Sequence, residues 1–146
     1  MDQINKPKFL MFRQPPKNQN DQIEYDALYR QKNLVQIHSF YCWFIKHMNV
    51  PLNGTLLDVA CGEGSFVKVA LSKGLDAYGT DISWFASKYA DKNLVSRIFV
   101  SNGEHIPIIS NTFDYITNIG SLEHFENMGK GLNEMSRVLK TNGKAF

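Results

Sequence analysis

The pattern of apolar and polar residues from about residue 51 onward alternates between short apolar runs and helical spacings. The first apolar run, Thr55–Val59, is typical of a strand buried on both faces of a sheet. Gly62-x-Gly64 follows it, and two residues without Cβ permit a tight turn. Over Ser65–Ser72 the apolar spacing is helical. A strand, a glycine turn and a helix in this order form the ligand-binding unit of an open α/β sheet.

The same alternation predicts the rest of the domain. Ser83 and Asn127 are suitable N-caps for two later helices, and Thr141-Asn142-Gly143 is expected to stop the second of them. Strands that alternate with helices predict a Rossmann-like α/β fold, a parallel sheet with helices on both faces. The further strands are expected at about Ala77–Asp81, Arg97–Val100, Phe113–Thr117 and Lys144–Phe146.

The predicted sheet is incomplete, with about four to five strands. A fifth strand of only three residues, Lys144–Phe146, leaves the fourth strand close to an open edge. Unpaired strand edges promote association between chains. We therefore expect a fold truncated at its C-terminal side and self-association through the unfinished edge.

The chain before this core divides into two segments. Residues 1–21 contain three prolines and many Asn and Gln, which predicts a flexible arm. Residues 22–50 carry apolar side chains in one broad helical stripe and predict a helical cap on the core, residues 51–146. Either Tyr25 or Tyr29 could close over a ligand, but an aromatic stripe at helical spacing is more often simple core packing.

Composition narrows the possible partners and the compartment. A net charge of +2 is too small to argue for a nucleic-acid partner, and no apolar run approaches the roughly 20 residues of a membrane span. Met1–Lys6 is not followed by the apolar region of a signal peptide. Cys42 and Cys61 are expected to be reduced thiols in a cytoplasmic protein. Since no Cys and His residues have metal-ligand spacing, we expect no metal site.

Two acidic residues indicate the kind of cofactor. Asp81 ends the second predicted strand about twenty residues after the glycine turn, where a carboxylate can bind both hydroxyls of a ribose. A dinucleotide site needs a third glycine, but Val67 stands in its place. Asp58, just before the turn, would repel a pyrophosphate. The residues therefore favour a ribose-bearing cofactor with an ammonium group and no phosphate.

The run Leu57-Asp58-Val59-Ala60-Cys61-Gly62-Glu63-Gly64 resembles motif I of the class I S-adenosylmethionine-dependent methyltransferases. The small-molecule branch of that family usually reads Leu-Asp-Val-Gly-Cys-Gly-x-Gly here. The resemblance covers about residues 56–146, and many weak motifs in order at family spacing form a strong signal. The other matching segments are Gly79–Ser83, Asn102–Pro107, Asn111–Tyr115, Ser121–Phe125 and Glu134–Lys140.

The resemblance implies S-adenosyl-L-methionine as the cofactor and assigns residues to its parts. Ala60 stands where relatives usually have glycine, and Asn102 where they often have an acidic residue, although its carbonyl can still accept a bond from adenine. The implied contacts are Asp58, Ala60, Cys61, Gly62 and Gly64 to the methionine part, Asp81 to the ribose, Ile82, Asn102 and Gly103 to the adenine, and Asn118 to Ser121 near the transferred methyl group.

The resemblance also implies the reaction, the transfer of a methyl group to a small-molecule acceptor. His124 is the candidate general base for a hydroxyl or an acidic carbon, although a lone His more often merely packs, here on the loop under the cofactor. Two other functions stay open. One is a truncated, non-catalytic module that binds the cofactor or needs a partner to complete its sheet. The other is a nicotinamide-dependent dehydrogenase.

Overall fold

The structure is a computed structural model that describes residue 23 and residues 38–146. The expected arm, residues 1–21, lies outside the described residues, as do most of the expected cap and both Tyr25 and Tyr29. The described part of the cap is one helix, α2 (His38–Met48).

The core is a five-stranded sheet in the order β3-β2-β1-β4-β5, in which every neighbouring pair is parallel. This is the Rossmann-like fold that the alternating pattern predicts. β1 lies at the centre, where four of its five residues are buried and three of these, Leu56, Leu57 and Val59, are apolar, as a strand covered on both faces requires. The strands are β1 (Thr55–Val59), β2 (Asp76–Asp81), β3 (Ile98–Val100), β4 (Phe113–Thr117) and β5 (Leu139–Ala145).

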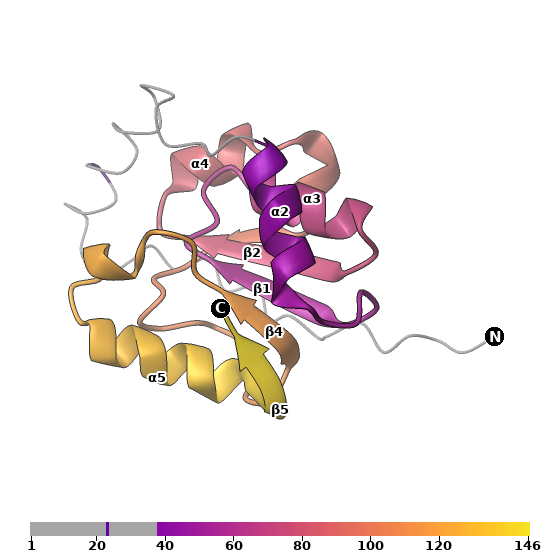
Figure 1. The fold of residues 1–146 in the computed structure, drawn as a ribbon. Coiled ribbons are helices and arrows are strands. Elements are labelled where there is room, and N and C mark those ends of the chain that lie inside the picture. Colours follow the sequence, from indigo (N-terminus) through magenta and orange to yellow (C-terminus); the bar gives the residue numbers. More distant parts are fainter. Residues whose placement is uncertain (1–22, 24–37) are drawn as a thin grey trace.

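Helices cover both faces of the sheet (Figure 1), with α2, α3 (Ser65–Ser72) and α4 (Trp84–Tyr89) on one face and α5 (Met128–Val138) on the other. Successive residues of β1 point to opposite faces. Leu56 therefore packs in the core under α2 and α3, and Leu57 packs in the core under α5. α2 rests on α3 through aromatic rings, with Tyr41 and Phe66 centroids 5.6 Å apart. Two short 3-10 helices, η1 (Lys92–Leu94) and η2 (Leu122–His124), complete the described elements.

The two predicted helix N-caps are confirmed. Ser83 Oγ accepts a hydrogen bond from the Ala86 backbone N–H at 3.0 Å, and Asn127 Oδ1 accepts one from Lys130 at 3.0 Å. Each cap satisfies a backbone donor that the first helical turn leaves unpaired. Gly74, with a φ of 100°, follows α3 in the left-handed conformation that commonly ends a helix.

The predicted boundary between α5 and β5 is wrong. The helix ends at Val138, before Thr141-Asn142-Gly143, and β5 begins at once with Leu139. Tertiary pairing ends the helix early, because the Val138 carbonyl accepts a hydrogen bond from the Thr112 backbone N–H at 2.8 Å. The register then shifts before Lys144 and Ala145 pair with β4.

None of the described helices combines the length and hydrophobicity that a membrane span requires.

Candidate functional site

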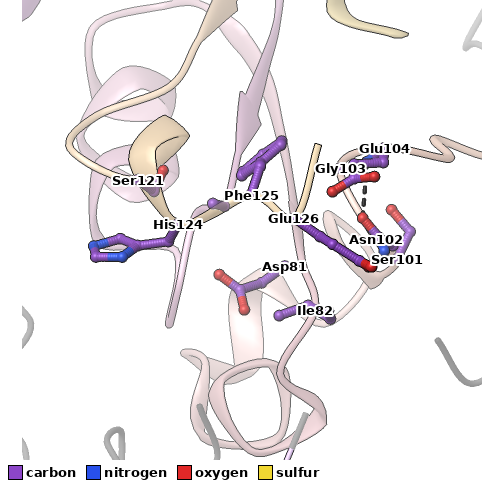
Figure 2. Close-up of a pocket in the computed structure, with 11 residues that line it drawn as sticks. Asp81, Ile82, Ser101, Asn102, Gly103, Glu104, Ser121, His124, Phe125 and Glu126 are labelled. Atoms are coloured by element: carbon purple, nitrogen blue, oxygen red, sulfur yellow. Dashed lines mark hydrogen bonds between the residues drawn. The ribbon is translucent and has the colours of Figure 1, made fainter. Parts of the chain in front are cut away.

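A pocket opens beyond the carboxyl end of β2 and contains about 620 Å³ of empty space, part of it open to solvent. Three of its lining residues, Asp81, Glu104 and Glu126, are acidic, and none is Lys or Arg. Seven of the predicted site residues line it: Ala60, Asp81, Ile82, Asn102, Gly103, Ser121 and His124. The other lining residues are Ser101, Glu104, Phe125 and Glu126, and Figure 2 labels all of the lining except Ala60. Asp58, Cys61, Gly62, Gly64 and Asn118 lie outside the lining.

Asp81 is held by the backbone on both sides of its carboxylate. Its Oδ2 accepts a hydrogen bond from the Gly62 N–H and its Oδ1 accepts one from the Ser83 N–H, each at 2.8 Å. The residue is 4% exposed and still reaches the pocket. These two bonds fix the orientation of the carboxylate.

The turn between β1 and α3 contains three left-handed residues, with φ values of 62° at Ala60, 57° at Gly62 and 78° at Gly64. Ala60 adopts this conformation at a small energetic cost because it has a Cβ. A Cβ at Gly64 would overlap the Ile98 side chain, so this glycine lets α3 approach β3 closely. Ala60, which stands where the motif usually has glycine, is therefore the strained residue of this turn.

Asp58 is a buried carboxyl group behind this turn, 4% exposed. Its Oδ1 accepts a 2.7 Å hydrogen bond from Thr117 Oγ1. Burial raises the pKa of Asp58 to about 7, the Thr117 bond opposes that rise, and the charge of Asp81 adds to it. The Asp58 carboxyl therefore changes its protonation state near neutral pH.

Cys61 turns away from the pocket and packs over β2. A Cβ at Gly79 would lie 2.5 Å from its Sγ, so the thiol occupies the space that this glycine leaves. Burial, followed by the charges of Asp81 and Asp58, raises the pKa of the Cys61 thiol. The thiol stays neutral and contributes packing, with its backbone N–H bound to the Thr80 carbonyl at 3.0 Å.

The loop that follows β3 forms the second wall of the pocket. Asn102 Oδ1 accepts a hydrogen bond from the Glu104 N–H at 2.8 Å (Figure 2). Ser101 Oγ and Thr80 Oγ1 are 2.5 Å apart and share a hydrogen bond. Glu104 is 6% exposed, and its Oε1 accepts a bond from the Asn127 N–H at 2.8 Å. The loop is thereby tied to β2 and to the start of α5.

The segment after β4 contains two buried oxygen atoms with unused hydrogen-bonding capacity. Asn118 Nδ2 donates to the Val59 carbonyl at 2.9 Å. Asn118 Oδ1 and Ser121 Oγ have no hydrogen-bond partner within the described part of the chain. Buried polar atoms are normally satisfied, so these two oxygens suit the donor groups of a ligand. His124, on the exposed η2, lines the same pocket.

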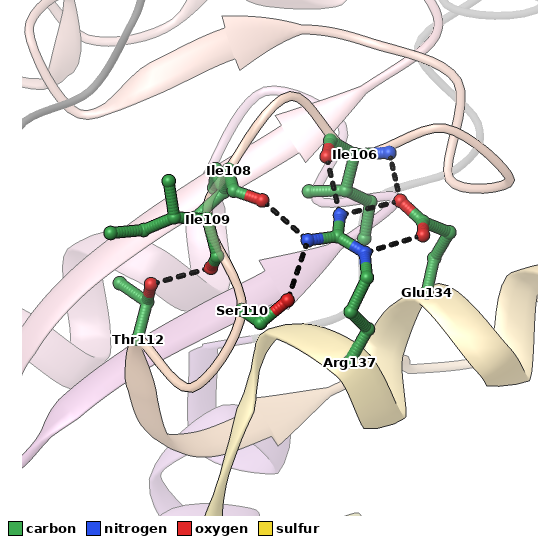
Figure 3. A network of polar contacts seen from close by, with 7 residues as sticks. All are labelled: Ile106, Ile108, Ile109, Ser110, Thr112, Glu134 and Arg137. Carbon is green, nitrogen blue, oxygen red and sulfur yellow. Dashed lines mark hydrogen bonds and ion pairs between the residues drawn. The ribbon is translucent and has the colours of Figure 1, made fainter.

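An ion pair on α5, absent from the sequence-based site, holds the next part of the same loop (Figure 3). Arg137 Nε and Nη2 donate to the two oxygens of Glu134 at 2.6 and 2.7 Å. The guanidinium also donates to the carbonyls of Ile106 and Ile108 at 2.8 and 2.7 Å. The i,i+3 spacing could have suggested the ion pair. Its backbone partners, about thirty residues away, leave no sequence signal.

Comparisons with known proteins identify the family and the fold of this chain. A family model described as "Methyltransferase domain" matches residues 57–146. The ubiquinone/menaquinone biosynthesis C-methyltransferase of Rickettsia typhi is 35% identical over 112 residues, which cover 66% of this chain and 45% of that protein. The demethylmenaquinone methyltransferase of Bacillus licheniformis is 32% identical over 106 residues, with the same two shares. This chain thus spans about half the length of the curated relatives it matches.

Solved structures share the fold. A protein from Pyrococcus horikoshii superposes with a TM-score of 0.65 and 31% identity, covering 80% of this chain and 56% of that one. An S-adenosylmethionine-dependent methyltransferase from Aquifex aeolicus gives a TM-score of 0.61 at 22% identity, covering 68% of this chain and 58% of that one. At this lower identity the likeness concerns the fold alone.

Proposed function

Because this chain belongs to the methyltransferase domain family, with the fold of the class I S-adenosylmethionine-dependent enzymes, we propose that it binds S-adenosyl-L-methionine and transfers its methyl group to a small-molecule acceptor. The observation that carries the proposal is Asp81. This carboxylate is oriented by two backbone N–H groups and faces a pocket at the carboxyl end of β2. Carboxylates at this position of a Rossmann-like sheet bind ribose hydroxyls.

The charge of the site supports this cofactor over a dinucleotide. The lining contains three carboxylates and no Lys or Arg, and Asp58 adds a further acidic group behind the turn. A pyrophosphate would meet repulsion here, whereas a sulfonium and an ammonium group would be attracted. The charge of the pocket therefore disfavours the nicotinamide-dependent dehydrogenase.

The remaining predicted contacts are part of the proposal. Ile82 would lie against the adenine, and the loop at Asn102-Gly103 would contact its edge. The backbone of the turn from Ala60 to Gly64 would face the methionine part. Asn118 Oδ1 and Ser121 Oγ are buried acceptors without partners in the described residues, and an ammonium group has three donors to offer them.

Methyl transfer depends mainly on the alignment of the acceptor with the methyl group of the cofactor. The cofactor supplies a methyl group that its sulfonium already activates, so this chain would act by holding the acceptor in line with the sulfur and by excluding water. His124 would take the proton from a hydroxyl or an acidic carbon of the acceptor, because an imidazole that lines the pocket can act as a general base. The alternative, packing under the cofactor, predicts little loss of turnover in His124→Gln.

The names of the two curated relatives, a ubiquinone/menaquinone biosynthesis C-methyltransferase and a demethylmenaquinone methyltransferase, favour a small, quinone-like acceptor. The alternative, a module that binds cofactor without turnover until a partner completes its sheet, is favoured by one observation. β5 is an edge strand with mostly exposed residues. Pairing along that edge would also produce self-association.

Calorimetric titration of the purified chain tests the proposal. S-adenosyl-L-methionine should bind and NAD should not. Asp81→Asn should weaken binding at least tenfold, because it removes the charge that faces the ribose. Asp91→Asn is the matched control, since Asp91 caps η1 outside the pocket lining. Binding of NAD in preference to S-adenosyl-L-methionine would overturn the proposal, and binding without methyl transfer to any quinone-like acceptor would favour the module.

A further inference from the structure

We propose that Phe125 is a positioning residue that sets the distance between the two walls of the pocket. The 121–126 segment forms one wall and the Ser101–Glu104 loop forms the other. Phe125 belongs to the first wall and, in the view of Figure 2, lies between His124 and that loop. The inference rests on the proposed function only where it names the ligand as S-adenosyl-L-methionine.

Two glycines from different elements make room for this one ring. A Cβ built at Gly103 would lie 2.6 Å from Cε2 and Cζ of Phe125, and one built at Gly131 would lie 2.6 Å from the same Cε2. No real Cβ tolerates such distances from a ring held in packing. One edge of the phenyl ring therefore touches the backbone of the loop and the backbone of α5 together.

Backbone conformation does not explain either glycine. Neither Gly103 nor Gly131 has a positive φ, so another residue could adopt their backbone angles. Gly131 also lies inside α5, where glycine is less favourable than alanine. The space that the Phe125 ring occupies is the physical reason for glycine at both positions.

A hydrogen bond supports the same connection. Glu104, the residue after Gly103, accepts a bond from the backbone N–H of Asn127, two residues after Phe125, at 2.8 Å. The loop is thus joined to the 121–127 segment by one ring contact and one polar contact. A change in the position of the ring should therefore move Asn102-Gly103, the part of the loop proposed to contact the adenine.

The test compares two alanines in the same helix. Gly131→Ala places a methyl group where the ring lies, whereas at Gly129 the nearest atom to a new Cβ is Asn127 Oδ1, at 3.3 Å. In the ligand-free chain, Gly131→Ala should speed hydrogen exchange of the Glu104 and Asn127 amides at least tenfold. Gly129→Ala should leave both rates within about twofold of the parent chain.

A second substitution that restores binding would distinguish a positioning role of Phe125 from a general loss of stability. Gly131→Ala should weaken S-adenosyl-L-methionine binding about tenfold, and the double variant Phe125→Leu/Gly131→Ala should recover most of that loss, because the smaller side chain leaves room for the methyl group. Should Gly131→Ala fail to fold, Phe125→Leu alone decides, with faster exchange at Glu104 and weaker binding expected.

Unchanged exchange at Glu104 in the variants that fold would overturn the proposal, as would a double variant no better than Gly131→Ala. The exchange measurement needs no cofactor. If the parent chain does not bind S-adenosyl-L-methionine, the proposed function fails, while the exchange rates still decide the role of Phe125.

Discussion

Thr117 Oγ1 on β4 donates a 2.7 Å hydrogen bond to Asp58 Oδ1 on the neighbouring strand β1. Both residues are almost fully buried, Thr117 at 0% and Asp58 at 4% exposure. The bond favours the ionised form of Asp58, but burial has the larger effect, and the pKa of the carboxyl rises to about 7. The charged form of Asp58 is therefore a source of instability in the ligand-free fold.

Asp58→Asn should stabilise the ligand-free chain at pH 8. The folded-state pKa is raised above the unfolded value, so the parent chain loses stability as pH rises from about 4 to about 7. The amide cannot ionise and escapes that loss. We expect a gain of about 1–3 kcal/mol in the free energy of unfolding at pH 8, measured by urea denaturation. The gain should shrink towards pH 4, and an equal gain at both pH values would contradict the raised pKa.

The affinity for S-adenosyl-L-methionine should rise with pH up to about 7. A cationic ligand in the neighbouring pocket favours the ionised form of Asp58, so binding at lower pH must release the proton that the raised pKa keeps on the carboxyl. The slope can reach at most about tenfold per pH unit. Titration calorimetry from pH 5.5 to 8 measures it. In Asp58→Asn the slope should flatten, and a slope that persists in that variant would assign the pH dependence to another group.

Ala60→Gly should stabilise the chain, because φ at Ala60 is 62° and a Cβ in this region costs about 1–2 kcal/mol. The greater conformational freedom of glycine in the unfolded chain offsets about 0.5–1 kcal/mol of the stability gained by relieving the strain. The net expectation is a gain of about 0.5–1 kcal/mol in the free energy of unfolding by urea denaturation.

The control for this change is Ala145→Gly, the same substitution at an exposed position of β5 without positive φ. It should cost about 0.5–1 kcal/mol. If Ala60→Gly is as destabilising as this control, the strain assigned to Ala60 is absent.

Arg137→Met should destabilise the fold by about 1–3 kcal/mol, because it leaves the Ile106 and Ile108 carbonyls without the guanidinium donors and leaves Glu134 with only its bond from the Ile106 N–H. Lys140→Met is the control, since its ion pair with Asp114 is more exposed and should contribute under about 1 kcal/mol. Thermal unfolding of both variants measures the difference. Equal losses of stability in the two variants would show that the Arg137 bonds to the Ile106 and Ile108 carbonyls do not stabilise the fold beyond the contribution of the ion pair.

The Arg137 bond lowers the pKa of Glu134. Its contribution to stability is therefore complete above the unfolded pKa of Glu134 and is lost as pH falls through the lower, folded-state value. The difference between Arg137→Met and the parent chain should shrink on acidification. A difference that stays constant down to about pH 3 would contradict this linkage.

Local signals were sufficient to predict much of the fold. Phe113–Thr117 is a strand and Ser65–Ser72 a helix with the predicted bounds, because apolar spacing and caps such as Ser83 act within a few residues. The end of α5 was not predictable in this way. It depends on Thr112, which pairs with the carbonyl of Val138 across the fold and takes the chain into β5 before the glycine-containing stop signal.

Some residues of the candidate site could likewise be predicted from local signals, whereas others depend on tertiary packing. Asp81 and Asn102 follow strand ends, and parallel strands bring their carboxyl ends to one edge, so the sequence could place both at one pocket. The contact of Phe125 with Gly103 and Gly131 depends on packing between three segments, and no periodicity encodes it. The unpaired oxygen of Ser121 is likewise visible only when its neighbours are known.

A cofactor site at Asp81 can be tested by titrating the isotope-labelled chain with S-adenosyl-L-methionine and following the backbone amide resonances. We expect the largest shifts at Gly62, Ile82 and Gly103, which surround the Asp81 side of the pocket, with little change on α2 at Trp43. Absence of shifts at these three residues, or shifts concentrated elsewhere on the sheet, would contradict a cofactor site at Asp81.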